Sequence, residues 1–484
     1  MASFKSDESF LEKIAIGAIG TQRVFENLKA QNQFPIELER GSMNYKIWKK
    51  IKIKRIRVPD ILCVNSGIRI ESRAKTNLEI SMSHSLSDPD RGWDFGMKDN
   101  DLVALVVCEK FGEKPIDWIA DELVQYISIK DLRQAEKNNQ VVFVKPKGAE
   151  EGFEARINWP ATISSSSGII KKISENSIQF SREIDSRTIS LRTTKKGLQI
   201  NPLVSVGETI KRNQILASVV PVCDILNTNT VDYKFYLENL TSIALSERYA
   251  ASKALAYFDN RQVGEELINK LKNVDEHIYI KLEAAASLAK QNIETGYEFI
   301  LSCLGDSYLQ NVLETVIILA EIKTETSCKI LCDILLSNNF DPEIKAGAAW
   351  ALGELKNKQS LNALIESFES ISESIKIEAS RSLAKLTTDY TGDIIEKFRQ
   401  ANSIQKSGIA WALTKSTTLK LDDLLNSLSD NDSRQWVSYI IGYQGEEYYI
   451  NEIEKLKNTD SEVYFAVTVL WKILTSWINN LNEY

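Results

Sequence analysis

The sequence predicts a multidomain protein with an α/β domain at residues 1–145, a small all-β module at residues 146–235 and an all-α repeat solenoid at residues 236–484. A chain of 484 residues exceeds the size that one hydrophobic core serves, so several structural units are expected. Residues 160–220 contain short β-type runs separated by Ser, Gly and Asn turns. An alanine-rich helical segment recurs at intervals of about 30 residues from residue 275 onward, which is typical of stacked helical repeats.

Composition narrows the class of protein. Hydrophobic residues make up 43% of the chain and charged residues 26%, as in soluble globular proteins. No run of about 18 apolar residues is present, and the N-terminus lacks the basic start and apolar core of a signal peptide. We therefore expect a cytoplasmic protein without a membrane partner. Six cysteines without a C-x-x-C pair, and only two histidines, favour reduced thiols and argue against a zinc site.

The N-terminal domain is expected to begin with a helix. Residues 9–31 place apolar side chains on one helical face, although Gly17 and Gly20 weaken the middle of this helix. In the basic run at residues 46–57, lysines alternate with isoleucines, which predicts a strand with one cationic face. There follow a turn at residues 65–67, a strand at 68–82, a loop at 83–101, a buried strand at 101–111, a helical or mixed segment at 117–136 and a strand at 140–145.

The strand at residues 68–82 is expected to carry its charges on one face, because alternate residues of a strand point the same way. This face holds Arg69, Glu71, Arg73 and Lys75, and the opposite face holds Ile68, Ile70, Ser72 and Ala74. Four charges in a row are costly to bury unless they pair or bind a ligand. The basic run is either a solvated edge strand or a face that contacts phosphate. In the second case the nucleic-acid-binding side chains are Lys50, Lys52, Lys54, Arg55, Arg57, Arg69 and Arg91.

The order of helix, basic strand, Val58-Pro59-Asp60, hairpin, Glu71-containing strand and apolar strand resembles that of the restriction-endonuclease-like PD-(D/E)xK nucleases. The resemblance implies that Asp60 and Glu71 hold a divalent cation, Mg²⁺ or Mn²⁺, on the scissile phosphate. Glu26 in the first helix would be an auxiliary metal ligand. Such a cation lowers the pKa of a bound water and neutralises charge on the phosphoryl group.

The sequence departs from this family at one position. The family has a lysine two residues after the glutamate, where this chain has Arg73, and a lysine follows only at Lys75. Arginine stays protonated and cannot act as a base, although it can stabilise a phosphate. The implied catalytic set is therefore Asp60, Glu71, Arg73 and Lys75, with either Lys75 or Arg73 in the role of the lysine. The other interpretations are a domain that has lost catalysis and only binds nucleic acid, and an unrelated α/β fold.

The loop at residues 84–94 combines charged side chains with one aromatic side chain. Arg91 and Trp93 suit contact with a nucleic-acid strand by charge and stacking. We favour instead an ordered surface loop anchored by Trp93, in which His84 is a hydrogen-bonded residue rather than a ligand.

The middle module contains a second recognisable pattern. Residues 206–211 (VGETIK) followed by residues 213–216 (NQIL) resemble the signature of barrel-sandwich hybrid modules, which include lipoyl-type domains. Asn213 stands at the second glycine of that signature, and asparagine also accepts a left-handed turn. No lysine lies in the M-K-M context that lipoyl or biotin attachment needs, so we predict no prosthetic group and expect a spacer or an interaction surface.

The helical repeat is clearest at residues 344–355 (IKAGAAWALGEL), and related segments begin at Leu282, Ile377 and Ser407. These segments resemble the HEAT-like repeats first associated with phycobilisome lyases. Predicted repeat starts lie near residues 246, 275, 306, 341, 373, 403, 431 and 460, several of them at Asp or Ser, which suit helix N-caps. Residues 236–484 carry 24 Lys/Arg against 36 Asp/Glu, which disfavours wrapping of nucleic acid and favours a protein partner or self-association.

Two functions follow from these patterns. The first is a metal-dependent nuclease carried on a HEAT-like interaction arm, acting in bacterial defence or DNA processing. The second is a non-catalytic HEAT-repeat scaffold or adaptor whose N-terminal domain binds nucleic acid or protein. A bilin lyase would share the repeat pattern, but the long N-terminal half has no counterpart in those enzymes.

Overall fold

The computed structural model describes residues 7–43, 51, 55–145, 154–223, 230–420, 422–425, 427 and 430–444. The chain divides into two compact units, residues 1–47 with 55–281 (unit 1) and residues 48–54 with 282–484 (unit 2). The α/β part, the β module and the first helices of the solenoid therefore belong to one unit. The predicted nucleic-acid contacts Lys50, Lys52 and Lys54, and the predicted repeat near residue 460, lie outside the described residues.

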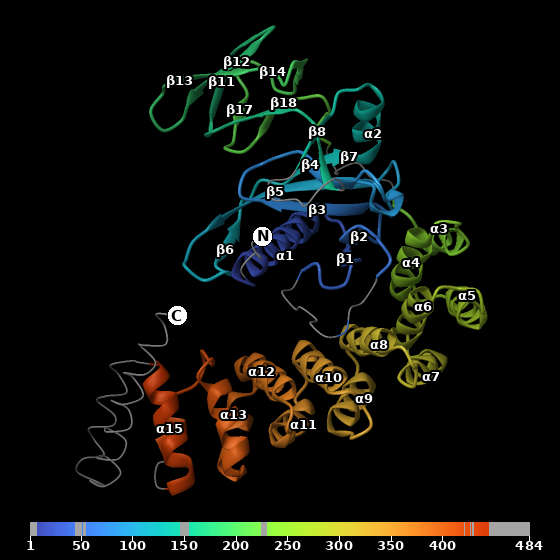
Figure 1. Ribbon diagram of the computed structural model, residues 1–484, viewed down its shortest axis with the longest axis vertical. Coiled ribbons are helices and arrows are strands. Elements are labelled where there is room, and N and C mark those ends of the chain that lie inside the picture. The colour runs from blue at the N-terminus through green and yellow to red at the C-terminus, as the bar shows by residue number, and fades with distance from the viewer. Residues whose placement is uncertain are drawn as a thin grey trace. The chain divides into compact units, whose positions relative to one another are not determined.

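Unit 1 is built on a mixed sheet (Figure 1). Its strands lie in the order β1 (Pro35–Glu37), β2 (Ile61–Cys63), β3 (Arg69–Lys75), β5 (Leu102–Lys110) and β6 (Trp118–Ala120), and β7 (Gln125–Ser128) also pairs with β5. β2 and β3 are antiparallel, whereas β3 and β5 are parallel. The predicted turn between β2 and β3 is confirmed, with a positive φ of 72° at Gly67. β5 is buried along most of its length, as its apolar run predicts.

Helix α1 (Asp7–Ala30) packs on the face of this sheet that carries Ile70 and Ala74 (Figure 1). A Cβ added at Gly20 would overlap the Cβ of Ala74, whereas one added at Gly17 would meet nothing within 4 Å. Gly20 therefore allows the helix to approach β3 closely, at some cost in helix propensity. The predicted alternation along β3 is confirmed on this side, and its charged residues lie on the other.

The other face of the sheet packs against a second sheet of three strands, in the order β4 (Ser81–Ser85), β9 (Glu154–Asn158) and β8 (Val142–Val144). Side chains from β4, β5, β7, β9 and helix α2 (Ile129–Lys137) share one core. The predicted loop at residues 83–101 is corrected here, since its first residues complete β4 and a short helix η1 (Pro89–Arg91) follows. Because β9 pairs with both β4 and β8, the sheet also continues past the predicted boundary at residue 145.

The β module follows as a chain of short strands around a separate apolar core. One sheet has the order β10 (Ala161–Ile163), β18 (Ile215–Ser218), β16 (Asn201–Pro202), and the other has the order β13 (Thr188–Arg192), β12 (Ser177–Arg182), β11 (Gly168–Ser174), β17 (Thr209–Ile210). A hairpin pairs β14 (Thr194–Lys195) with β15 (Leu198–Gln199). Asn213 adopts the expected left-handed conformation, with φ of 65°.

The first helices of the solenoid follow the β module, and two of them contact the α/β part of unit 1. They are α3 (Tyr233–Asn239), α4 (Leu245–Ala254), η2 (Leu255–Tyr257), α5 (Arg261–Lys272) and α6 (Ile278–Lys290), the last of which crosses into unit 2. The Tyr236 hydroxyl donates to the carbonyl of Val64 at 2.7 Å, and Arg40 donates to the Tyr249 hydroxyl at 2.9 Å. The chain thus shows no break in packing at the predicted boundary at residue 235.

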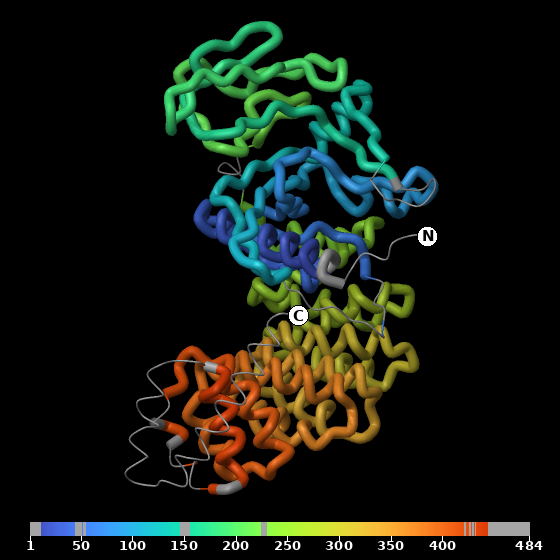
Figure 2. Tube along the Cα trace, turned by 60° about the vertical axis from the view of Figure 1, so that its left-hand side comes forward, coloured from blue at the N-terminus to red at the C-terminus, as the bar shows by residue number. Residues whose placement is uncertain are grey.

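Unit 2 continues as stacked helices (Figure 2). They are α7 (Glu294–Cys303), α8 (Leu309–Ile322), α9 (Glu325–Leu336), α10 (Pro342–Leu355), α11 (Ser360–Glu366), η3 (Ser367–Glu369), α12 (Glu373–Gln400), α13 (Ser403–Leu413), α14 (Asp422–Leu425) and α15 (Asn431–Gln444). The predicted starts at residues 341, 373, 403 and 431 are confirmed to within one residue by α10, α12, α13 and α15. Asp341 caps α10, its side chain accepting from the backbone N–H of Glu343 at 2.7 Å.

Cations near the starts of two repeats pair with an acid at the start of the following repeat. Arg248 binds Glu276 with its Nε 3.0 Å from the carboxylate, and Lys406 lies 3.1 Å from Asp430. These cations therefore serve the packing of neighbouring repeats. Within the described ranges, no helix is both long enough and apolar enough to cross a membrane.

Candidate functional site

Asp60 and Glu71 lie side by side on the charged face of the β2–β3 hairpin. Ile61 pairs with Ile70 in the antiparallel register, so the residues one step outward, Asp60 and Glu71, lie opposite each other. Both are buried, and the Asp60 carboxylate accepts a hydrogen bond from the backbone N–H of Ser72 at 2.7 Å. The hairpin therefore brings together the two carboxylates that the sequence pattern singles out.

Arg73 lies on the same face and pairs with one of these carboxylates. Its Nη2 is 2.5 Å from Oε1 of Glu71. Burial acts to lower the pKa of Arg73, but the negative charges of Glu71, Asp60 and a third carboxylate, Glu39, outweigh it and raise the pKa. The guanidinium is thus one positive charge that offsets the acids of this face, and Arg55 and Arg57 also lie near Glu39.

Glu39 is a member of this cluster that sequence reasoning missed. Its backbone N–H donates to the carbonyl of Asp60 at 3.2 Å, just after β1. Burial and then the charge of Glu71 raise the pKa of Glu39 to about 7, although Arg55, Arg73 and Arg57 act in the opposite direction. Burial, with the charges of Glu71 and Glu39, also raises the pKa of Asp60 well above its usual range. No motif marks Glu39; only the pairing of β1 with β2 brings it to this face.

Lys75 is held away from the acid cluster by a different partner. Its Nζ donates to Glu79 at 3.0 Å and also contacts the Ser81 hydroxyl. Burial lowers the pKa of Lys75, while the Glu79 carboxylate acts to raise it. Lys75 therefore stabilises the connection from β3 to β4.

Glu26 lies on α1, on the opposite side of the sheet from the acid cluster. It pairs with Arg23 at 3.2 Å, and its side chain is 66% exposed. In the described part of the chain, no three His, Cys, Asp or Glu side chains form a group suited to hold a metal ion. The predicted ligand set of Asp60, Glu71 and Glu26 is thus not assembled, because α1 covers the apolar face of β3. Since Arg73 already neutralises Glu71, this arrangement does not fit Mg²⁺ or Mn²⁺.

The predicted phosphate-contacting cations have structural partners where the structure describes them. Arg69 is 3% exposed and binds Asp101 through two hydrogen bonds of 3.0 and 2.5 Å, so it is not presented on a surface. Arg57 donates to the carbonyl of Asp90 at 2.8 Å, and Arg55 donates to the carbonyl of Arg40. Arg91 is exposed in η1. Arg69 is therefore enclosed, whereas Arg55 and Arg57 both lie near Glu39, and Arg57 also contacts the segment that carries Arg91.

The loop after β4 is anchored by its tryptophan, as favoured from the sequence. Trp93 is buried against Trp159, with ring centroids 4.8 Å apart, and its Nε1 donates to Glu136 at 2.9 Å. His84 accepts a hydrogen bond from the backbone N–H of Trp93 at 3.3 Å. Trp93 is therefore a core residue and is not available to stack on a base.

Comparison with known proteins identifies one segment of the solenoid. Residues 344–370, which run from within α10 to the residue after η3, match the PBS lyase HEAT-like repeat. This match confirms the predicted HEAT-like character of the repeats. No curated protein matches the chain.

Solved structures show partial similarity. The complex of CpcE and CpcF of phycocyanin lyase from Nostoc sp. PCC7120 is 16% identical, covering 52% of this chain and 98% of that chain with a TM-score of 0.26. An engineered protein is 18% identical, covering 49% of this chain and 77% of that chain with a TM-score of 0.23. Scores of this size support no conclusion about what the chain binds.

Proposed function

We propose that this chain is a non-catalytic adaptor, in which the HEAT-like helices bind a partner protein and the α/β part is a structural docking module. The observation that carries this proposal is the ion pair between Arg73 and Glu71 within the acid cluster. The paired Glu71 and the hydrogen-bonded Asp60 are the two carboxylates that a nuclease of this type would need for its cation.

Two further features oppose a nuclease. The guanidinium of Arg73 stays protonated, so it cannot accept a proton from water in the place of the lysine of that family. Lys75 donates to Glu79 and Ser81 instead of to the acid cluster. Phosphate binding also requires accessible cations, and one of the predicted phosphate contacts, Arg69, is enclosed with Asp101.

The helical half has the surface of a protein-binding module. Its net negative charge disfavours nucleic acid. Ile371 is completely exposed, and Ile377 and Ile404 are 46% and 59% exposed on neighbouring helices. Contiguous exposed apolar side chains are common where one protein binds another. Stacked helical repeats supply long surfaces for such contacts.

A cleavage assay tests this proposal. Purified protein is incubated with labelled single- and double-stranded DNA and RNA in Mg²⁺, Mn²⁺ or EDTA, beside a Glu71→Gln variant of equal folding. We expect no metal-dependent cleavage above the level of that variant. Metal-dependent cleavage that Glu71→Gln abolishes would overturn the adaptor proposal and restore the nuclease.

A further inference from the structure

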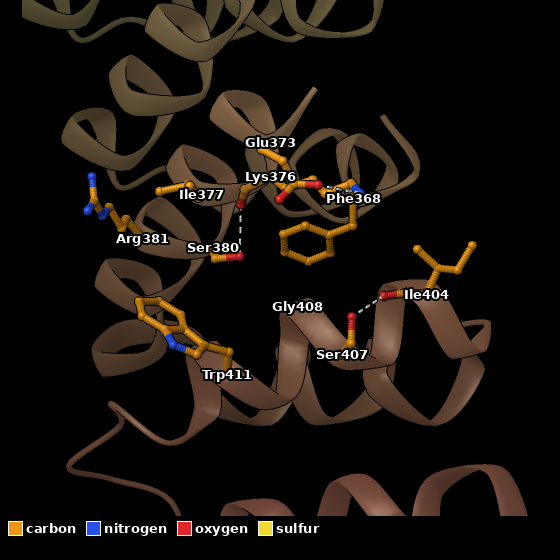
Figure 3. A pocket seen from close by; sticks show the side chains of 10 residues that line it. All are labelled: Phe368, Glu373, Lys376, Ile377, Ser380, Arg381, Ile404, Ser407, Gly408 and Trp411. Carbon is orange, nitrogen blue, oxygen red and sulfur yellow. Dashed lines mark hydrogen bonds and ion pairs between the residues drawn. The ribbon is translucent and has the colours of Figure 1, made fainter. Parts of the chain in front are cut away.

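A groove of about 480 Å³ lies between α12 and α13 in unit 2 (Figure 3). This volume is within the ~300–1,000 Å³ typical of ligand pockets. One face of each helix lines it, with residues spaced three or four apart. The lining residues are Phe368, Glu373, Lys376, Ile377, Ser380, Arg381, Ile404, Ser407, Gly408 and Trp411.

The floor of the groove depends on a glycine. A Cβ added at Gly408 would lie 2.6 Å from ring carbons of Phe368. Phe368 is buried and comes from η3, so its ring reaches between the two helices only because residue 408 has no side chain. Trp411 closes one end and is half-buried, whereas the equivalent tryptophan of α10, Trp350, is buried.

The two serines of the groove do not make it polar. The Ser380 hydroxyl donates to the carbonyl of Lys376 at 2.8 Å, and the Ser407 hydroxyl donates to the carbonyl of Ile404 at 2.6 Å (Figure 3). Each hydroxyl therefore has a hydrogen-bond acceptor within its own helix and needs no polar group of a ligand as a partner. With Ile377 and Ile404 exposed on the two walls, the groove suits large apolar side chains.

Cations border this apolar floor. Lys376 and Arg381 lie along α12. Lys376 pairs with the exposed Glu373, an arrangement that stabilises little, whereas Arg381 pairs with Glu378, whose side chain is only 9% exposed. Lys415 lies beyond Trp411, 5.4 Å from the centre of its ring. Its other described contact is with the ring and hydroxyl of Tyr443 rather than with a carboxylate. The groove is therefore bordered by three cations and one acid, Glu373, and so has an excess of positive charge in a helical half with an excess of acids.

We infer that this groove binds an acidic amphipathic segment of a partner protein, with apolar side chains on the floor and carboxylates toward Lys376, Arg381 and Lys415. This inference rests on the proposed adaptor function and adds the surface and the chemistry of the partner. Helical segments commonly dock this way, with apolar anchors about one turn apart in a groove between helices. The surrounding cations select for acidic segments and against basic ones.

Fluorescence anisotropy with the full chain tests the inference, using three labelled helical peptides as probes. The first has two leucines one turn apart flanked by glutamates, the second has lysine at every glutamate, and the third has serine at both leucines. We expect the first probe to bind at least about tenfold more tightly than either of the others. No detectable binding of the first probe at ~1 mM, or equal binding of the lysine probe, would overturn the inference.

A matched pair of variants locates the binding site. Ile404→Glu places a carboxylate in the groove, and Ile371→Glu makes the same change at a fully exposed isoleucine that does not line it. We expect the first variant to weaken binding at least about tenfold and the second to leave it unchanged. Equal effects of the two variants would show that the probe binds elsewhere.

Two outcomes separate this inference from the adaptor proposal. Self-association that Ile404→Glu abolishes, without binding of the first probe, would identify a second copy of this chain as the occupant and overturn the inference. If the first probe does not bind and nucleic acid is not cleaved, the groove is not the binding site, but the adaptor proposal stands with another binding surface.

Discussion

The half-buried Glu39 makes the stability of unit 1 depend on pH in an unusual direction. Its pKa is raised from the ordinary 4.5 to about 7, by burial first and then by the charge of Glu71. Below pH 4.5 the group is protonated in both the folded and the unfolded chain and contributes no difference. Between pH 4.5 and about 7 the unfolded chain loses this proton while the folded chain retains it, so the free energy of unfolding falls across this interval and levels off above it.

The size of the effect follows from the shift. Each pKa unit corresponds to ~1.4 kcal/mol, so an increase from 4.5 to about 7 corresponds to about 3 kcal/mol. Glu39 is only partly buried, and screening by solvent reduces this value, so we expect about 2 kcal/mol. Glu39→Gln removes the titration and should therefore match the unmodified protein at pH 4.5 but be about 2 kcal/mol more stable at pH 8.

Hydrogen exchange followed by mass spectrometry measures this difference where it arises. Protection of peptides from β2 and β3 is compared at pH 5 and pH 8, after correction for intrinsic exchange, in the unmodified protein and in Glu39→Gln. Glu26→Gln, an exposed carboxylate on α1, is the control and should change protection little at either pH. A stability difference for Glu39→Gln that is the same at both pH values would refute the reasoning.

Two further predictions concern packing in unit 1. Gly20→Ala should destabilise the unit by about 1–3 kcal/mol because the added Cβ overlaps β3. Gly17→Ala should stabilise it by roughly 0.5–1 kcal/mol, because this position is open and alanine has the higher helix propensity. Urea denaturation measures both free energies of unfolding, and equal effects would contradict the close approach of α1 to β3. Arg69→Met should cost about 3–5 kcal/mol because it leaves Asp101 buried without its partner, while Arg261→Met, at a 93% exposed arginine, should cost under about 1 kcal/mol. Thermal melting compares the two variants, and similar melting temperatures would show that the buried pair is dispensable.

Local patterns allowed much of the fold to be predicted from the sequence. The apolar periodicity of α1, the continuous apolar run of β5 and the recurring alanine-rich segments depend on neighbours within a few residues, and each is confirmed. The juxtaposition of Asp60 and Glu71 was likewise accessible, because a short turn fixes the register of β2 and β3. These features are local, so the sequence around them determines them.

Long-range contacts explain what the sequence did not reveal. Glu39 joins the cluster only through the pairing of β1 with β2, and Arg69 meets Asp101 across 32 residues of chain. The alternation that placed Arg69 on a charged face was right, but alternation does not tell whether the face is covered. β4 has serines and a histidine where strands usually carry apolar residues, so its pairing with β9 had no local marker.

The position of Arg73 connects the charges of the acid cluster with the proposed function, because this side chain lies where a nuclease would need a bound cation. Three carboxylates on one face need a compensating positive charge, which a bound cation or a side chain can supply. Here a guanidinium on β3, which is covalently part of the chain, lies 2.5 Å from Glu71 and can supply it without a bound cation. The stability of the β2–β3 hairpin should therefore be independent of divalent cations. We expect hydrogen exchange in β2 and β3 to be the same in Mg²⁺ and in EDTA, whereas Arg73→Ala should lower protection in both. Greater protection of the unmodified protein in Mg²⁺ would mean that a cation, rather than Arg73, balances these acids.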